Sequence, residues 1–147
     1  MDEADIRLRN ATYRSFVELG RAPTPSEVAA GLGIVVEEAR EGWRRLHDAH
    51  ALVLDPATGD LRMANPFSAV PTPFRVRAAG REWFANCGWD AFGIGAALHV
   101  DSVVDTQCAD CTTPLRIQVR DGRPDDENHV FHVLVPAFEW WQDIGFT

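Results

Sequence analysis

The chain has 147 residues, of which 46% are hydrophobic, and a formal net charge of −8, so it is long enough for one domain or two small subdomains with a buried core. No apolar run reaches the roughly 18 residues of a transmembrane helix, and the acidic N-terminus lacks the apolar stretch of a signal peptide, so we expect a cytoplasmic protein with no membrane partner. The absence of lysine excludes lysine-based catalysis, and 4 arginines against 11 acidic residues in 81–147 argue against nucleic-acid binding by that half.

Three helices are predicted in the first 50 residues. Residues 4–19 have amphipathic spacing and are followed by Gly20, a good helix terminator. Thr24 and Pro25 are typical of the N-cap and first position of a second, short helix. A third helix is predicted from about Val36 to His50.

A hairpin is predicted next, from the apolar residues 52–54 and 61–63 around a turn-forming 55–60 segment. Three helices plus a hairpin give a winged-helix-like module over residues 1–64, a pattern often used to bind DNA. The arginines of the third helix are interleaved with glutamates, whereas a recognition helix normally carries a clearer basic excess. These residues are Glu37, Glu38, Arg40, Glu41, Arg44 and Arg45. We therefore favour a scaffold or dimerisation module over DNA binding.

The rest of the chain is predicted to be a connector and a mixed helix–strand half. Residues 65–80 are proline-rich but carry apolar side chains, which indicates an ordered connector. In residues 81–147 we expect a helix over 81–99, and then strands and a last helix. These are strands at 100–106, 115–120 and 130–135 and a helix at 137–144. The predicted fold class is α+β, with a small mixed sheet and flanking helices following the helical module.

Cys87 and Asp90 are the most informative pair of residues. Positions i and i+3 share one face of a helix, so this spacing puts a thiol beside a carboxylate in an aromatic, apolar segment. A thiolate is a nucleophile and a soft-metal ligand, and a carboxylate beside it can carry a proton. The ordinary alternative is a buried cysteine acting as a small hydrophobe and a capping or solvated aspartate.

Three segments resemble the bacterial organomercurial (alkylmercury) lyases in order and spacing. The first is Asn-Pro-Phe-Ser-Ala-Val-Pro-Thr at 65–72, followed by Phe-Arg-Val at 74–76. The second is Ala-Asn-Cys-Gly-Trp-Asp-Ala-Phe-Gly-Ile at 85–94, and the third is the run from Val133 to Thr147. The resemblance extends from about Asn65 to the last residue, and the helical module resembles the family in architecture more than in motif.

The resemblance implies a carbon–mercury lyase that requires no cofactor. The residues matching Cys87 and Asp90 belong to the family's active site, where the thiolate attacks mercury and the carboxylate passes a proton to the leaving carbon. Hg(II) is then the bound product, held by Cys87 and Asp90. The family's second catalytic cysteine directly follows the residues matching Phe146 and Thr147, where this sequence stops. Either the sequence is cut one residue short or it is a natural variant with altered chemistry.

Cys108 and Cys111 form a Cys-x-x-Cys pair at a predicted strand end. A structural zinc site needs four ligands, usually two such pairs or added histidines, and no second pair exists. His129, His132 and Cys87 would complete a site only through the tertiary fold. We favour a structural pair, with replacement of the terminal cysteine by one of these thiols as the alternative. Cys111 is the thiol added relative to the family and a candidate metal ligand.

Two further classes of function stay open beside the lyase. One is a thiol-based protein that binds a soft metal or small electrophile without cleaving it. The other is a metal-responsive regulator built on the winged-helix-like module. The expected partners are a small organometallic or electrophile and small cellular thiols, while the oligomeric state is not predicted.

Overall fold

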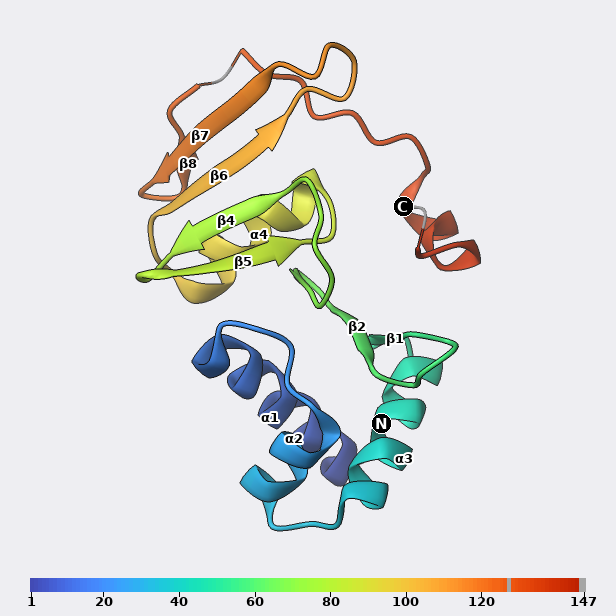
Figure 1. The fold of residues 1–147 in the computed structure, drawn as a ribbon. Coiled ribbons are helices and arrows are strands. Elements are labelled where there is room, and N and C mark those ends of the chain that lie inside the picture. The colour runs from blue at the N-terminus through green and yellow to red at the C-terminus, as the bar shows by residue number, and fades with distance from the viewer. Residues whose placement is uncertain (127, 146–147) are drawn as a thin grey trace.

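The computed structural model describes residues 1–126 and 128–145. Its first part is a three-helix layer, α1 (Glu3–Leu19), α2 (Pro25–Leu32) and α3 (Val36–Asp48) (Figure 1). The predicted end of the first helix is confirmed, since Gly20 caps α1 in a left-handed conformation. Thr24 forms a capping box with Glu27 at the start of α2, which satisfies two amides that the helix itself leaves unpaired.

A buried hydrogen bond joins α1 and α3 inside the core of the helical layer. Trp43 of α3 is fully buried, and its indole N–H donates to the hydroxyl of Thr12 on α1 at 2.9 Å. Phe16, Val28 and Leu46 fill the surrounding space. Buried apolar area of this kind stabilises the folded state, and the hydrogen bond removes the cost of burying a polar N–H group.

The predicted hairpin is also present. Strand β1 (Val53–Leu54) pairs antiparallel with β2 (Leu61–Ala64). The Asp55 carboxylate accepts the backbone N–H groups of Ala57 and Thr58 at 2.9 and 3.0 Å, an arrangement that favours a tight turn. Three helices and a hairpin thus follow in the expected order, and the winged-helix assignment of residues 1–64 stays a prediction.

The strands join one eight-stranded sheet, which confirms the α+β class. The order is β1-β2-β3-β5-β4-β6-β7-β8, and the added strands are β3 (Phe67–Ser68), β4 (Arg75–Ala78), β5 (Arg81–Ala85), β6 (Ser102–Gln107), β7 (Pro114–Arg120) and β8 (Arg123–Pro124). We expected a mixed sheet, but every strand pair among the described residues is antiparallel. Most strands that are adjacent in the sheet are also consecutive in the sequence and joined by short turns, which requires antiparallel pairing. The expected connector contributes two of these strands.

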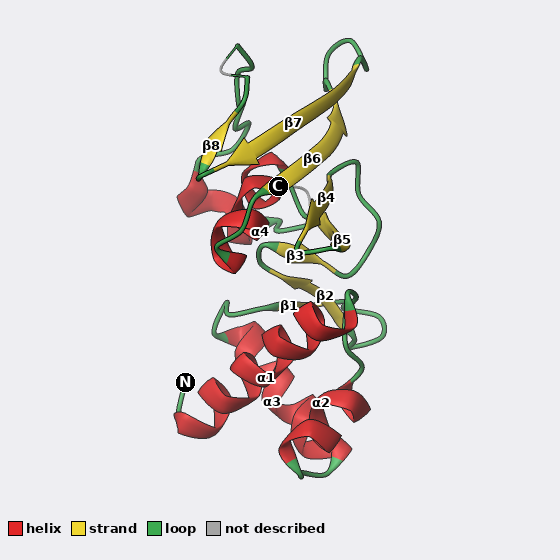
Figure 2. Cartoon of the chain, turned by 90° about the vertical axis from the view of Figure 1, so that its left-hand side faces the viewer, coloured by secondary structure: helices red, strands yellow, loops and turns green. Residues whose placement is uncertain are grey.

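The predicted helix over 81–99 is wrong in its first part. Residues 81–85 form β5, which pairs with β4 in the register Val76↔Trp83, and the helix α4 is Gly88–Leu98. The apolar residues of 81–85 are also compatible with a helix, but Trp83 and Ala85 are buried at alternate positions, as in a strand with one buried face. Pairing with β4 therefore decides its conformation. Figure 2 shows α4 lying against one face of the sheet.

The predicted strand over 130–135 is absent from the structure. Residues 128–135 take an irregular path and belong to none of the described strands, while β8 pairs only with Val119 and Arg120 at the end of β7. The last helical segment is a 3-10 helix, η1 (Ala137–Gln142), and its Trp141 stacks on His50 at 3.9 Å between ring centroids. Phe146 and Thr147, where the family's motif ends, lie outside the described residues.

Aromatic contacts join the helical layer to the sheet. Phe16 of α1 stacks on Phe67 of β3 with ring centroids 5.1 Å apart, and Phe67 meets Trp83 of β5 at 5.7 Å. All three rings are buried, so the two halves share one core. None of the helices in the described part of the chain is long and apolar enough to cross a membrane.

Candidate active site

Cys87 is the residue at which strand β5 passes into helix α4. It is the N-cap of α4, with an extended backbone, and its carbonyl accepts the N–H of Ala91 at 2.9 Å. We expected Cys87 inside a helix, which is incorrect, but N-cap and N3 are neighbouring positions and Asp90 is N3. The sulfur makes no capping hydrogen bond to the described helix, although serine, threonine or aspartate would normally make one there.

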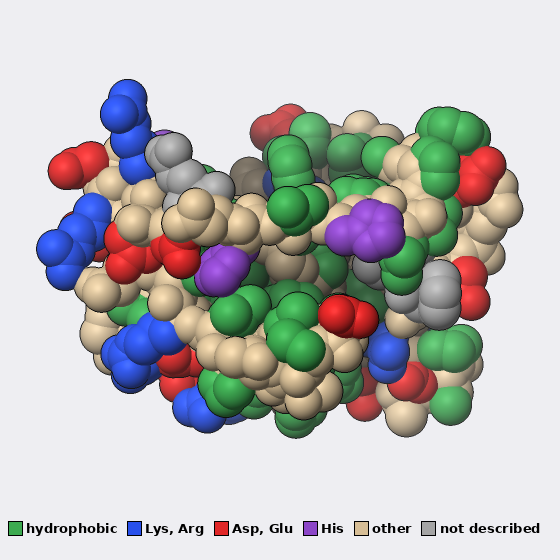
Figure 3. Space-filling model, turned by 90° about the horizontal axis from the view of Figure 1, so that it is seen from above, with side chains coloured by type: hydrophobic (Ala, Val, Ile, Leu, Met, Phe, Trp, Pro, Cys, Tyr) green, Lys and Arg blue, Asp and Glu red, His purple; other side chains and the backbone are tan. Residues whose placement is uncertain are grey.

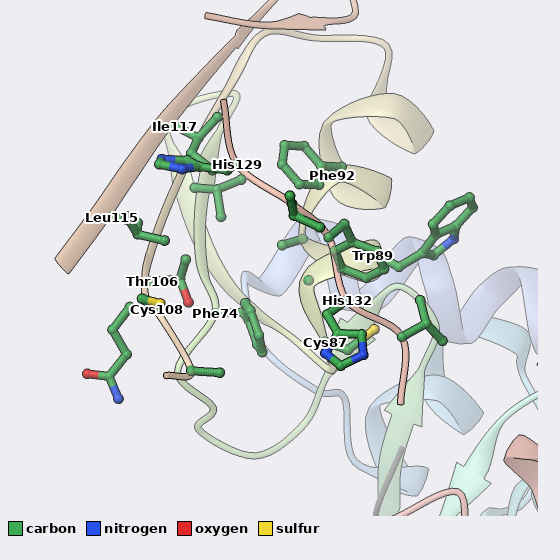
Figure 4. Close-up of a pocket in the computed structure, with 18 of the residues that line it drawn as sticks. Phe74, Cys87, Trp89, Phe92, Thr106, Cys108, Leu115, Ile117, His129 and His132 are labelled. Carbon is green, nitrogen blue, oxygen red and sulfur yellow. The ribbon is translucent and has the colours of Figure 1, made fainter. Parts of the chain in front are cut away.

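The thiol faces a mainly apolar cavity of about 690 Å³. Most of its wall comes from the start of α4, strands β6 and β7, Phe74 before β4, and residues 129–135, and Ala109, Pro124, Asp126 and Trp140 complete it. Figure 4 shows Phe74, Phe92 and Trp89 around Cys87, and Figure 3 shows hydrophobic side chains gathered round the hollow on this face. Apolar walls with few polar groups are typical of small-molecule sites.

Gly88 lets the C-terminal segment lie close to the start of α4. A Cβ atom at Gly88 would lie 2.5 Å from Cε2 of Phe131, which is too close without a shift of the ring. Phe131 also contacts Trp89, with ring centroids 6.3 Å apart. The segment 128–135 therefore covers the cavity next to the thiol.

The surroundings of Cys87 favour the neutral thiol. Burial raises its pKa above the ordinary value, the nearby backbone N–H of Asp90 opposes this without forming a capping hydrogen bond, and the Asp90 charge raises it further. Loss of hydration disfavours a thiolate in an apolar wall. The thiol is consequently protonated at neutral pH until a metal displaces the proton, since a metal-bound thiol is deprotonated.

Asp90 sits beside the thiol but is not among the described residues that line the cavity. Burial raises the pKa of its carboxyl, and a hydrogen bond from Asn86 opposes the rise. The Asn86 amide Nδ2 lies 2.9 Å from Oδ2 of Asp90. A carboxyl with a raised pKa holds a proton more firmly than an exposed one, which suits proton transfer.

Sequence reasoning missed the polar network behind Asp90. Asn86 Nδ2 also lies 3.2 Å from Oδ1 of Asn65 and 3.3 Å from the carbonyl of Phe67. The Tyr13 hydroxyl on α1 donates to the Asn65 carbonyl at 2.9 Å. Burial raises the Tyr13 pKa, Arg9 opposes this, and the Asp90 charge raises it further. The helical layer thus reaches the carboxylate, and only the adjacency of Asn86 to Cys87 could have signalled this.

Cys108 and Cys111 stand on a turn between β6 and β7. Cys108 lines the cavity, and Cys111 is exposed and outside its described wall. The Cys111 sulfur lies 3.2 Å from the Thr113 hydroxyl, and hydrogen bonds from Thr113 and then Cys108 lower its pKa to about 7. The structure therefore brings Cys108, rather than Cys111, to the space that Cys87 faces.

His129 and His132 also line the cavity, where Figure 4 shows both side chains. Their sequence positions gave no sign of this, because the segment 128–135 reaches the cavity without strand pairing. Among the described residues, no group of three or more His, Cys, Asp or Glu side chains could hold a metal ion. The histidines and thiols are therefore dispersed around the wall rather than gathered at one point.

The family model for MerB, alkylmercury lyase, matches residues 67–147. The chain belongs to the alkylmercury lyase family. Its match begins at β3 and includes Cys87, Asp90, Cys108 and Cys111, while Tyr13 and Asn65 precede it. A comparison with curated proteins gave no match.

A solved structure shares the fold of this chain, including part of the helical layer. The crystal structure of the mercury-bound form of MerB2 superposes with a TM-score of 0.69 at 21% identity, over 86% of this chain and 60% of that one. Residues 67–147 are little more than half of the chain, so a match over 86% includes part of residues 1–66. This likeness shows a shared fold, and the chain spans about 60% of the length of the MerB2 chain.

Proposed function

We propose that this protein cleaves carbon–mercury bonds, with Cys87 as nucleophile and mercury ligand and Asp90 as proton carrier and later oxygen ligand. One observation carries the proposal: in a chain of the alkylmercury lyase family, a cysteine thiol faces an apolar cavity and stands beside a carboxyl whose pKa is raised. Mercury is the substrate atom, and the reaction requires no resident cofactor.

The first step forms a bond between the Cys87 sulfur and mercury. A soft metal prefers a thiolate ligand, so the Cys87 sulfur replaces the acetate or small thiolate that mercury carries beside its organic group, and the thiol proton is released. Asp90 takes this proton, which its raised pKa favours over release to water. The Asp90 charge that raises the Cys87 pKa disappears at the same moment, and this stabilises the thiolate–mercury bond.

The second step breaks the bond between carbon and mercury. Asp90 turns from Asn86 and gives its proton to the carbon, which takes the electron pair of the carbon–mercury bond. The products are a hydrocarbon and Hg(II) held by Cys87, with the Asp90 carboxylate again charged and available as an oxygen ligand. A second thiolate on mercury weakens the carbon–mercury bond, and small cellular thiols can supply it.

The cavity favours apolar organic groups. Phe74, Phe92 and Phe131 lie on its wall with several aliphatic side chains, so a methyl or aryl group is buried when mercury reaches Cys87. Such burial is worth about 25 cal/mol per Å² of apolar surface. It also excludes water from the reacting carbon, which strengthens the electrostatic effect of Asp90. We place this activity in the cytoplasm, where thiols stay reduced.

The proposal is tested by benzene release from phenylmercury acetate, measured by gas chromatography in excess small thiol. We expect the parent chain to release one benzene per phenylmercury consumed, and Cys87→Ser to release none while keeping its melting temperature or raising it. Cys111→Ser is a matched control under these conditions, because Cys111 lies outside the described wall of the cavity. Benzene release by Cys87→Ser at the parent rate would contradict the assignment.

A second candidate is a thiol-based binding protein that holds a soft metal without cleaving a bond. The observation that favours it is the position of Asp90, which is not among the described residues of the cavity wall. A carboxyl that stays bonded to Asn86 would leave captured phenylmercury intact. Stoichiometric retention of phenylmercury with no benzene would support this function over the lyase.

The helical module is proposed to support the site rather than bind nucleic acid. The three arginines of α3 face acidic partners: Arg45–Asp5 at 2.9 Å, Arg44–Glu37 at 3.1 Å and Arg40–Asp60 at 3.9 Å. Cations so paired attract phosphate less strongly. We propose residues 1–64 as this module, 65–80 as an ordered connector and 81–147 as the catalytic half. Absence of a mobility shift with random duplex DNA at low salt is the expected result.

A further inference from the structure

The turn between β6 and β7 holds two thiols at the edge of the cavity. Backbone hydrogen bonds fix this turn: the N–H of Cys108 donates to the Thr113 carbonyl at 2.9 Å, and the N–H of Thr112 donates to the Cys108 carbonyl at 3.0 Å. Cys108 is near enough to the Cys111 sulfur to help lower its pKa to about 7. The turn therefore presents two adjacent sulfur ligands.

The two thiols face different surroundings. Cys108 lines the cavity that Cys87 lines, whereas Cys111 is exposed. The pair thus bridges the inside of the cavity and the solvent. We infer that Cys108 and Cys111 form a two-thiolate site for Hg(II), which receives the metal released at Cys87 and presents it to solvent. The inference rests on the proposed function for the source of the metal.

The ligand set selects a soft ion of low coordination number. Zinc in a structural site needs four ligands, and no group of three His, Cys, Asp or Glu side chains that could hold a metal occurs in residues 1–126 and 128–145. Two thiolates are enough for Hg(II), which forms stable two-coordinate thiolate complexes. The acidic composition of residues 81–147, with 4 arginines against 11 acidic side chains, also attracts a cation.

The transfer needs no oxidant or further reactant. Hg(II) leaves the Cys87 sulfur and forms bonds with the Cys108 and Cys111 sulfurs, and both of their protons are released. One of these protons returns to Cys87, and the other goes to water. Both sulfur–mercury bonds are formed by side chains, so the turn keeps its backbone hydrogen bonds.

Mercury retention by the full chain tests the site without any turnover. Mercuric chloride is added with excess 2-mercaptoethanol, and mercury per chain is measured after desalting. We expect the Cys87→Ser variant to retain one mercury per chain. The double variant Cys87→Ser/Cys111→Ser should retain none. Asp110→Asn in the Cys87→Ser background is the matched control, because it changes the same turn and keeps both thiols. Zinc chloride should give no retention.

Several results would overturn this site. These are retention of mercury by Cys87→Ser/Cys111→Ser at the level of Cys87→Ser, no retention by Cys87→Ser, or stoichiometric zinc. Since Cys111 is exposed, equal melting temperatures are expected and exclude misfolding as the cause of a loss. The transfer step is tested by steady-state benzene release without external thiol, which should fall in Cys111→Ser and recover with excess 2-mercaptoethanol. Equal release by both chains without thiol would overturn the transfer.

The outcomes separate this site from the lyase proposal. A chain that retains mercury at the pair but releases no benzene contradicts the lyase function alone. A chain that releases benzene in excess thiol, but whose Cys87→Ser variant retains no mercury, contradicts the two-thiolate site alone.

Discussion

The amide nitrogen of Asn86 lies 2.9 Å from the carboxylate of Asp90, and this bond links the end of β5 to the first turn of α4. Burial raises the Asp90 pKa, and the bond opposes that rise because it favours the charged form. Asn86 is in turn close to Asn65 and to the Phe67 carbonyl. The proton affinity of Asp90 therefore depends on residues that never reach the cavity.

Asn86→Ala should move the acid limb of the pH–rate profile to higher pH. Without the amide, burial acts unopposed and the Asp90 pKa rises further, so the carboxylate that accepts the Cys87 proton is lost at a higher pH. The measurement is kcat/KM for benzene release as a function of pH. Asn10→Ala, an exposed residue of α1, is the control. An unchanged acid limb would mean that Asp90 does not carry the proton.

Cys87→Ser should abolish mercury chemistry and stabilise the fold at the same time. Cys87 is an N-cap without a capping hydrogen bond, and serine is among the preferred N-cap residues, worth about 1 kcal/mol over a non-capping residue. For a chain of this size that corresponds to a melting temperature about 3 °C higher. Cys111→Ser, which caps no helix, should leave the melting temperature unchanged. A cysteine kept where serine stabilises more is expected for a residue that serves chemistry.

Asp90→Asn should separate capture from cleavage. The change keeps the size of the side chain but removes the proton carrier, and general acid–base catalysis contributes roughly 10²–10⁴-fold to a rate. We expect benzene release to fall by about this factor while phenylmercury still binds to Cys87, as measured by mass spectrometry of the intact chain. Loss of binding equal to the loss of turnover would instead identify a structural carboxylate.

Local sequence signals predicted the helices of the first part of the chain, whereas long-range strand pairing determined the conformation of the second part. Thr24, Glu27 and Gly20 act through the backbone within a few residues, so their pattern predicts helix ends. The segment at 81–85 has no such signal, and its strand exists because β4 lies beside it. Alternation alone likewise predicted a strand at 130–135, but this segment pairs with no described strand and packs on the start of α4 through Phe131.

The residues of the site also fall into those predicted from local spacing and those brought together only by the tertiary fold. The spacing of Cys87 and Asp90 was enough to expect a thiol and a carboxylate side by side, because N-cap and N3 are neighbours as i and i+3 within a helix are. Asn86 becomes a partner of Asp90 only when Asn65 and Phe67 are brought to the end of β5. His132 reaches the cavity on a segment whose alternation predicted a strand, whereas the structure gives it an irregular path.

Cys111 and Cys87 should react with iodoacetamide in an order set by their surroundings. Hydrogen bonds from Thr113 and Cys108 lower the Cys111 pKa to about 7, so its alkylation should be half-maximal near that pH. Burial raises the Cys87 pKa, so Cys87 should need a pH above the ordinary range for a thiol, because only the thiolate reacts. Peptide mass mapping after timed alkylation from pH 6 to 10 gives the order. Equally fast alkylation of Cys87 and Cys111 at pH 7 would contradict it.

Cys108 is the described cavity residue best placed to supply a second sulfur for bond cleavage. It lines the same cavity as Cys87, whereas Cys111 is exposed and outside the described wall. A second thiolate on mercury weakens the carbon–mercury bond, so Cys108→Ser should slow the single-turnover release of benzene when no external thiol is present. Cys111→Ser should leave that single turnover unchanged and slow only later turnovers, because it impairs removal of Hg(II). Added 2-mercaptoethanol should restore the Cys108→Ser rate in part. Equal single-turnover rates for the parent and Cys108→Ser would show that Cys87 and Asp90 cleave the bond without a second sulfur from this cavity.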